Sequence, residues 1–192
     1  MLETYIGIDP GYLAGGIVIL SDSRALGAAS WRRLRRKSGD VWRVDIELFD
    51  APLLMKRAYC GSFWEALDTI WGALPVRPYH LAVEQPFIPK GRMSGLVKLI
   101  ESTGGLLGVF GPAALSVQRP TPNQWRKSIL NLGGRTPAAE AEREAVRWTQ
   151  ETMNLGTLRE NGHVCEAACI ALWMRNNAPS PSLTLLGPSK PA

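Results

Sequence analysis

The sequence predicts a single α/β domain with a mixed five-stranded sheet flanked by helices. Three β-rich segments come first, and helical and strand segments alternate after them, which is the pattern of a mixed sheet with helical crossovers. The chain has 192 residues, of which 45% are hydrophobic and 20% charged, as in an ordinary globular domain. A chain of this length buries roughly 70% of its unfolded surface, so it can fold without a disulfide or a metal.

The predicted strands follow from β-branched runs and turn signals. Pro10-Gly11 separates the first two runs, and the third alternates polar and apolar residues as an antiparallel strand does. The fourth, HLAVE, is a short apolar run that Pro86 stops. The five predicted strands cover residues 4–9, 15–20, 41–49, 80–84 and 115–118.

The predicted helices follow from apolar residues at helical spacing, and Pro75 ends the first of them. After Asn177 the sequence APSPSLTLLGPSKPA contains four prolines and three serines, a composition typical of a disordered tail. We therefore expect one folded domain at residues 1–176 and a disordered tail at 177–192. The five predicted helices cover residues 62–74, 94–110, 122–130, 137–153 and 163–175.

Composition also limits the partners and the compartment. The 22 Lys and Arg residues against 17 Asp and Glu give a net charge of +5, which favours a polyanionic partner. The sequence has neither an apolar stretch of membrane-spanning length nor a leader of the secretory type, so we expect no membrane contact and a cytoplasmic location. The three cysteines, Cys60, Cys165 and Cys169, are expected to be reduced thiols. Cys165 and Cys169 lie near His163 but lack a fourth ligand, so we expect no zinc site there.

Positive charge is concentrated in residues 31–43, WRRLRRKSGDVWR. Six cations against the single acid Asp40 suit a phosphate backbone, and Trp31 and Trp42 would offer rings to unpaired bases. The alternative is a solvated hairpin whose charges prevent strand pairing with other chains. The cations are Arg32, Arg33, Arg35, Arg36, Lys37 and Arg43.

Acidic residues end two of the predicted strands. Asp9 closes the first strand at the carboxyl edge of the sheet, where α/β sheets bind their ligands, although it could instead cap the turn that follows. Glu84 closes the buried fourth strand. A buried carboxylate needs a partner, which could be a cation at this site or a nearby arginine.

His163 and Glu166 lie three residues apart on one face of the last predicted helix. They could be a surface histidine beside a glutamate that favours the helix dipole. If instead these groups meet Asp9 and Glu84, each pair of carboxylates at ~4 Å repels by about 4 kcal/mol at an effective dielectric near 20. Such a cluster persists with divalent cations, and oxygen-rich ligation suits Mg²⁺ or Mn²⁺. Two such ions are suited to phosphodiester hydrolysis.

Three segments, IGIDPG at 6–11, AVEQPF at 82–87 and HVCEAACIAL at 163–172, together resemble the RuvC family of Holliday-junction resolvases. The resemblance implies a ribonuclease H-like fold and a homodimeric endonuclease that makes paired symmetrical nicks in four-way DNA junctions during recombination and repair. It also implies two Mg²⁺ ions per active site, with Mn²⁺ as a substitute, and an intracellular protein of a bacterium or an infecting phage. The implied catalytic residues and metal ligands are Asp9, Glu84, His163 and Glu166.

The resemblance extends to DNA contacts and to the dimer. Phe87 would stack on bases at an opened junction or, alternatively, pack into the core. The family's dimer helix corresponds to the segment with Gly104, Gly105 and Gly108, although packing within one subunit would give the same pattern. The sequence departs from the family in three ways. Glu166 stands where the family usually has aspartate, arginines partly replace its lysines, and residues 31–43 are more basic than the resemblance requires. The expected DNA-binding residues are Arg32, Arg33, Arg35, Arg36, Lys37, Phe87, Lys90, Arg92, Arg126, Lys127 and Arg135.

Two other functions remain open from the sequence. The same fold could act on other branched DNA or on RNA–DNA hybrids, because this fold supports several chemistries. A protein that binds junctions without cutting them is the second alternative, and Glu166 in place of aspartate favours it.

Overall fold

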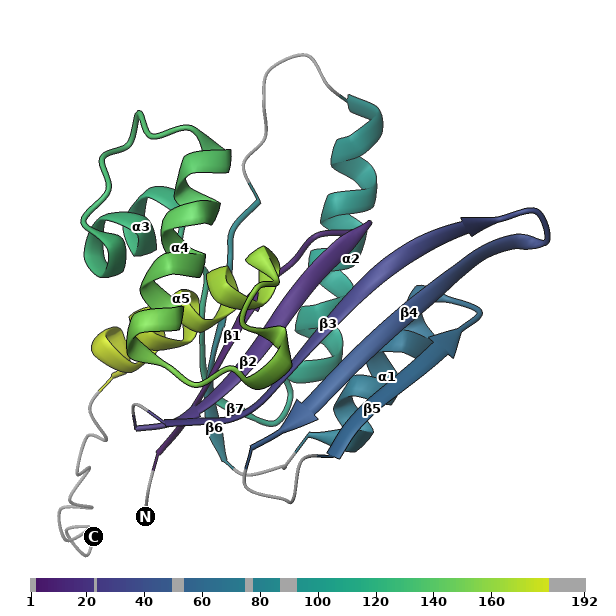
Figure 1. The fold of residues 1–192 in the computed structure, drawn as a ribbon, viewed down its shortest axis with the longest axis horizontal. Coiled ribbons are helices and arrows are strands. Elements are labelled where there is room, and N and C mark those ends of the chain that lie inside the picture. The colour runs from purple at the N-terminus through teal and green to yellow at the C-terminus, as the bar shows by residue number, and fades with distance from the viewer. Residues whose placement is uncertain (1–2, 23, 50–53, 75–77, 87–92, 180–192) are drawn as a thin grey trace, which may run out of the picture.

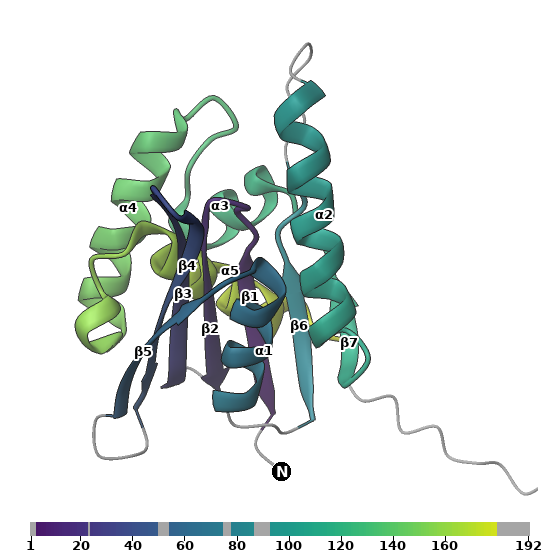
Figure 2. The same cartoon turned by 90° about the vertical axis from the view of Figure 1, so that its right-hand side faces the viewer.

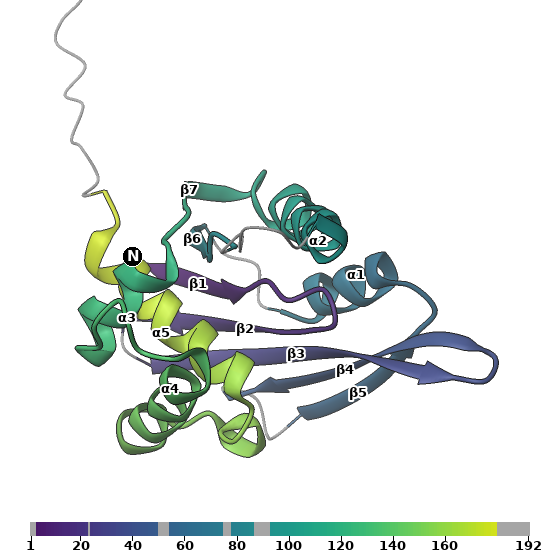
Figure 3. The same cartoon turned by 90° about the horizontal axis from the view of Figure 1, so that it is seen from above.

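The computed structural model describes residues 3–22, 24–49, 54–74, 78–86 and 93–179. A seven-stranded mixed sheet forms the middle layer, in the order β5-β4-β3-β2-β1-β6-β7. Helices α3, α4 and α5 lie on one face of the sheet and α1 and α2 on the other (Figures 1 and 3). The predicted α/β class with a mixed sheet is confirmed.

The first five strands form an antiparallel meander, and the last two run parallel to β1 on its other side. This arrangement places the ends of β1 and β6 at the same edge, because Ile8 of β1 pairs with Val83 of β6. The strands are β1 (Thr4–Asp9), β2 (Ala14–Ser21), β3 (Arg24–Arg36), β4 (Gly39–Leu48), β5 (Leu54–Cys60), β6 (Tyr79–Val83) and β7 (Ala114–Gln118).

The predicted strand count of five is wrong, because two strands have no clear apolar alternation. Strand β3 begins in the small residues ALGAAS, where alanines pack on both faces, and ends in arginines that extend past the rest of the sheet. Strand β5 reads LMKRAYC and pairs only with β4 at the sheet edge. Cross-strand pairing fixes both strands where local hydrophobic pattern is weak.

The five predicted helices are all present within small differences at their ends. Helix α5 is buried on nearly every side because α3 and α4 cover its outer surface while its inner surface packs on the sheet (Figure 2). No helix in the described ranges is long and apolar enough to cross a bilayer. The helices are α1 (Phe63–Ala73), α2 (Met93–Phe110), α3 (Pro122–Leu130), α4 (Ala138–Thr152) and α5 (Gly162–Asn177), with a 3-10 turn η1 (Gly156–Leu158) before α5.

Two glycines let α5 approach the sheet closely. A Cβ atom at Gly7 would lie 2.2 Å from the carbonyl oxygen of Ala167, and one at Gly16 would lie 2.4 Å from that of His163. Both contacts are with backbone, so a side chain at either position would push α5 away from β1 and β2. These glycines therefore set the distance between the N-terminal half of α5 and strands β1 and β2.

The expected disordered tail falls almost entirely outside the described residues, because α5 ends at Asn177 and residues 180–192 are not described. The three cysteines are buried free thiols.

Candidate metal centre and nucleic-acid surface

The carboxyl ends of β1 and β6 bring Asp9 and Glu84 together. The backbone N–H of Glu84 donates a hydrogen bond to the carbonyl of Ile8 at 3.0 Å, which continues the β1–β6 ladder one residue past β6. Asp9 is the last residue of β1, and its side chain is 10% exposed. Both carboxylates thus lie at the sheet edge that the sequence predicted for them.

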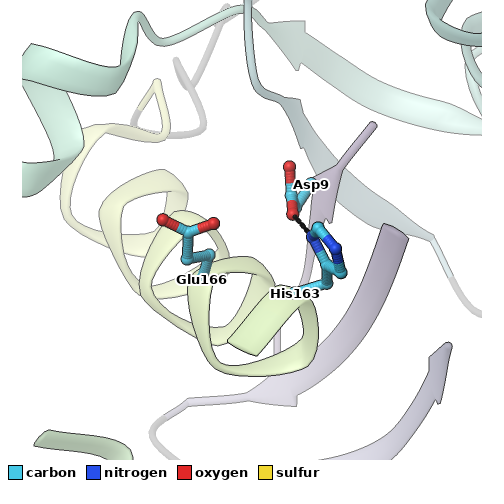
Figure 4. Close-up of side chains that lie close together, drawn as sticks. All are labelled: Asp9, His163 and Glu166. Atoms are coloured by element: carbon cyan, nitrogen blue, oxygen red, sulfur yellow. Dashed lines mark hydrogen bonds and ion pairs between the residues drawn. The ribbon is translucent and has the colours of Figure 1, made fainter. Parts of the chain in front are cut away.

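The first turns of α5 supply the other two groups. Asn161 caps the helix by accepting a hydrogen bond from the Val164 N–H at 3.2 Å. His163 Nδ1 lies 2.5 Å from Asp9 Oδ2, and one ligating atom each of Asp9, His163 and Glu166 lies within 4.8 Å of the others. Figure 4 shows the three side chains converging from β1 and α5. Asp9 therefore uses its side chain across the fold and not to cap its own turn.

Burial dominates the electrostatics of this cluster. Desolvation, and then the charge of Asp9, raise the pKa of Glu84 from 4.5 to about 7. Desolvation, followed by the charges of Asp9 and Glu84, raises the pKa of Glu166 to about 8. The hydrogen bond to Asp9 raises the pKa of His163 above its ordinary value. The cluster therefore disfavours full ionisation when no cation is bound.

Helix α3 contributes two neighbouring residues to the cluster. The buried Trp125 donates its indole N–H to Glu84 Oε1 at 2.8 Å, and Arg126 Nη2 lies 3.2 Å from Glu166 Oε1. Glu84 thus has an indole as its hydrogen-bond partner where the sequence suggested an arginine as one alternative. Sequence reasoning missed Trp125, because a tryptophan among apolar helix positions indicates core packing and carries no sign of its N–H partner.

A cleft of about 710 Å³ opens beside these groups. The β1–β2 turn, the residues after β6, α3 and the connection from α3 to α4 form its walls. Lys127 and Arg135 are exposed to solvent. Lys127 lies on α3, and Arg135 lies in the connection that follows this helix. The residues with polar side chains in the lining are Asp9, Glu84, Gln85, Thr121, Asn123, Arg126 and Thr136.

The basic stretch 31–43 forms the end of a long hairpin of β3 and β4, which extends beyond the other strands (Figure 1). Trp31 and Trp42 are 1% and 3% exposed, so the expectation that they stack on bases is wrong. Both pack under α1 with Phe63, because their strand positions face that side of the sheet. Arg33 is ion-paired with Asp40.

Three of the expected DNA-binding residues, Phe87, Lys90 and Arg92, lie outside the described residues. The others divide between two places. Arg126, Lys127 and Arg135 belong to α3 and the loop after it, beside the cleft, whereas the remaining five cations lie on β3 and its turn to β4.

Comparisons with known proteins give a structural likeness only. No family model matches the chain, and no curated protein matches its sequence. Thermus thermophilus RuvC matches with a TM-score of 0.48 and 18% identity, over 90% of this chain and 93% of that one. T. thermophilus RuvC in complex with a Holliday junction substrate matches with a TM-score of 0.51 and 16% identity, over 92% of this chain and 94% of that one. The chain therefore has the predicted ribonuclease H-like fold, over nearly its whole length.

Proposed function

We propose that this protein is a divalent-metal-dependent endonuclease that resolves four-way DNA junctions by paired symmetrical nicks. The observation that carries the proposal is the convergence of Asp9, His163 and Glu166, whose ligating atoms lie within 4.8 Å of one another. Glu84 lies beside them, and the charge of Asp9 raises the pKa of its carboxyl. A second support is the fold shared with a RuvC protein whose structure holds a Holliday junction substrate.

The donor set fits Mg²⁺ or Mn²⁺. Three carboxylates and one imidazole give mainly oxygen ligands, which these ions prefer. Glu84 and Glu166 are largely buried, and a divalent cation compensates the cost of ionising them there. The residues that would hold the metal are Asp9, Glu84, His163 and Glu166, and we propose that they bind two ions. When bound, such a pair supplies an activated water and charge stabilisation for phosphodiester hydrolysis.

The protein's own groups would position the substrate at this edge of the sheet. Arg126 pairs with Glu166 and lines the cleft, so its guanidinium is placed to bind a phosphate oxygen entering there. Trp125 fixes the direction of Glu84 by donating to one of its two oxygens, which leaves the other oxygen for a cation. His163, with a side chain 42% exposed, forms the open side of the cluster.

We further propose that the protein is a homodimer formed through α2. Val97 and Ile100 of this helix are 55% and 52% exposed, and no atom lies within 4 Å of a Cβ placed on Gly104 or Gly108. Gly105 differs, because Trp64 of the same subunit packs against it. A two-fold dimer would present two metal centres to a two-fold junction. Light scattering should give a dimer mass, and Ile100→Asp should reduce it to a monomer.

The decisive experiment compares three labelled substrates: a synthetic four-way junction, a linear duplex and an RNA–DNA hybrid, each with Mg²⁺ or EDTA. We expect symmetrical nicks in the junction alone, and only with Mg²⁺. Cleavage of the hybrid alone would support a ribonuclease instead. Tight junction binding without cutting in Mg²⁺ or Mn²⁺ would support the non-catalytic alternative, which Glu166 in place of aspartate favours.

A further inference from the structure

One row of paired residues connects the metal centre to the far edge of the sheet. Asp9 pairs with Gly16, Gly16 with Ser30, Ser30 with Asp45, and Asp45 with Arg57. Directly paired residues point to the same face of a sheet. This row therefore shares the face on which α5 lies. Helix α5 packs mainly on β1 and β2 and makes a smaller contact with β3 (Figure 3). Asp45 and Arg57 lie beyond it, on β4 and β5.

Asp45 holds two arginines on the uncovered part of this face. Its side chain is 7% exposed, although the strand around it is at the open end of the sheet. Arg57 Nε donates to Asp45 Oδ1 at 2.5 Å, and Arg43 Nε forms an ion pair with Oδ2 at 2.8 Å. Because a guanidinium has five N–H groups, both arginines keep their outer Nη donors for another anion. The Arg43 and Arg57 side chains are 35% and 49% exposed.

The next row towards the hairpin end adds an aromatic ring and more charge. Arg32, Arg43 and Tyr59 are paired across β3, β4 and β5. Tyr59 is 54% exposed, and the guanidinium of Arg36 lies over its ring at 5.2 Å. Arg33 and Arg35 alternate to the opposite face, where Arg33 lies over Tyr12. The stretch that was expected to bind DNA as a unit is thus divided between two faces.

The other acidic residue on this face, Glu47, is buried and would not repel a bound anion. Glu47 of β4 is fully buried beneath η1, where the backbone N–H and the hydroxyl of Thr157 donate to its Oε2 at 2.9 and 2.8 Å. Among the described residues of β3, β4 and β5, the exposed charged side chains on this face are therefore arginines, and Asp45 lies beneath two of them.

We propose that this face of β3, β4 and β5 is a second phosphate-binding surface, which holds the backbone of the DNA arm leaving the metal centre. We call it the arginine face, defined by Arg32, Arg36, Arg43, Arg57 and Tyr59. Within it, Asp45 is a positioning residue that holds Arg43 and Arg57 as a pair. The inference rests on the proposed function, because it assigns the path of that substrate.

The sheet geometry gives the distance from the metal centre to the arginine pair. Asp45 is three strands from Asp9 and Arg57 is four, so at a strand spacing of about 4.8 Å they lie about 14–19 Å from it. A DNA strand advances about 3.4 Å per nucleotide, so this distance corresponds to about four to six nucleotides. The arginine pair should therefore contact phosphates about four to six nucleotides from the nick.

The test measures junction affinity of the full chain in EDTA, where no cutting is expected. Arg43→Gln with Arg57→Gln should weaken binding about 10- to 100-fold and reduce the salt slope of log K by about 1.8, at ~0.9 per phosphate contact. The matched control is Arg35→Gln with Lys56→Gln, which removes the same charge from the opposite face of the same strands, β3 and β5. This control should change both quantities far less.

A neutral methylphosphonate placed at each phosphate in turn locates the contact. With the natural chain, affinity should fall most at about the fourth to sixth position from the nick. With the Arg43 and Arg57 double variant, the same substitutions should have little further effect. Equal sensitivity in the double variant and in the natural chain would overturn the inference.

Asp45→Asn separates positioning from bulk charge. The change makes the protein more positive, so simple attraction to DNA would increase the affinity. If Asp45 holds the pair, affinity falls instead by about fivefold or more while circular dichroism shows a folded protein. Tighter binding would contradict the role of Asp45. If the natural protein neither binds nor cuts junctions, the proposed function fails; if it cuts normally and the double variant matches its control, only the arginine face is wrong.

Discussion

The same face of one sheet has two contrasting regions. Over β1 and β2, helix α5 covers the face and buries carboxylates, whose pKa values rise as a result. Over the part of β3, β4 and β5 beyond α5 and η1 the face is open, and arginines lie in solvent around the paired Asp45. Both regions share a row of hydrogen-bonded strands, from Asp9 to Arg57.

The difference shows that helix cover decides what a charge needs. Buried carboxylates that repel each other must either take up a proton or bind a cation, because water no longer screens them. Exposed arginines are stable in solvent, and the two that Asp45 holds keep their Nη donors for another anion. The covered region is therefore suited to chemistry and the open region to holding the substrate.

The largest expected effect is the loss of cutting in Asp9→Asn. The change removes a charged ligand from the centre of the cluster, and we expect the rate to fall about 10³-fold or more, equivalent to about 4 kcal/mol. Junction affinity should stay the same or increase, because one negative charge is lost. Single-turnover cleavage and anisotropy binding measure the two effects. A normal cutting rate would remove the metal assignment from the covered region.

Gly16→Ala tests the close approach of α5 to the sheet. Its Cβ would lie 2.4 Å from the His163 carbonyl oxygen, so α5 must shift. We expect about 1–3 kcal/mol of destabilisation and about a 10²-fold loss of cutting, since small displacements of catalytic groups are costly. Gly72→Ala is the control, because nothing lies within 4 Å of a Cβ there. Thermal melts and cleavage rates that match in the two variants would contradict this account.

Trp125→Phe removes one N–H from the covered region and keeps most of the ring volume. The loss of a group that orients a metal ligand should weaken Mn²⁺ affinity and cutting about 10-fold. Junction affinity in EDTA should not change. Trp148→Phe, in the same half of the core but away from the cluster, serves as the control. Mn²⁺ affinity equal to that of the natural chain would show that the indole only fills space.

The smallest effect is a dependence of stability on pH without metal. The carboxyl pKa values of about 7 for Glu84 and about 8 for Glu166 exceed the unfolded value of 4.5. Between pH 4.5 and these raised values, the folded state therefore binds more protons than the unfolded state. Stability therefore falls as pH rises through this window, and the raised pKa of His163 acts in the same direction. We expect the Tm in EDTA to be several degrees lower at pH 8.5 than at pH 5.5, at about 2–4 °C per kcal/mol.

Mn²⁺ should remove most of this pH dependence, because a bound cation favours the ionised carboxylates. Glu166→Gln should reduce it even in EDTA. An EDTA melting curve that is independent of pH in this window would show that the covered carboxylates are better solvated than their burial indicates.

Sequence was sufficient for the covered region because its signals are local. Asp9 and Glu84 end apolar strands, and strand ends of parallel neighbours meet at one edge. His163 and Glu166 share a helix face by spacing alone. The indole bond of Trp125 was not predictable, since it depends on how α3 packs on β6.

The open region was harder to predict because pairing between strands defines it. The small residues of β3 and the charges of β5 give no alternation to recognise, so both strands were missed. Without β3 as a strand, the alternation that separates Arg32 from Arg33 could not be applied. Trp31 was assigned to the surface for the same reason. Trp42 lay inside the predicted strand 41–49, on its apolar side with Val44 and Ile46, so its burial could have been predicted.

The order in which the four acidic and imidazole groups are synthesised has a consequence for the cell. Asp9 and Glu84 are synthesised before His163 and Glu166, which belong to α5, the helix that the two glycines allow to pack closely on the sheet. A nascent chain that has not yet docked this helix carries half of the ligands. Under the proposed function, unfinished or truncated translation products would therefore be harmless to the genome.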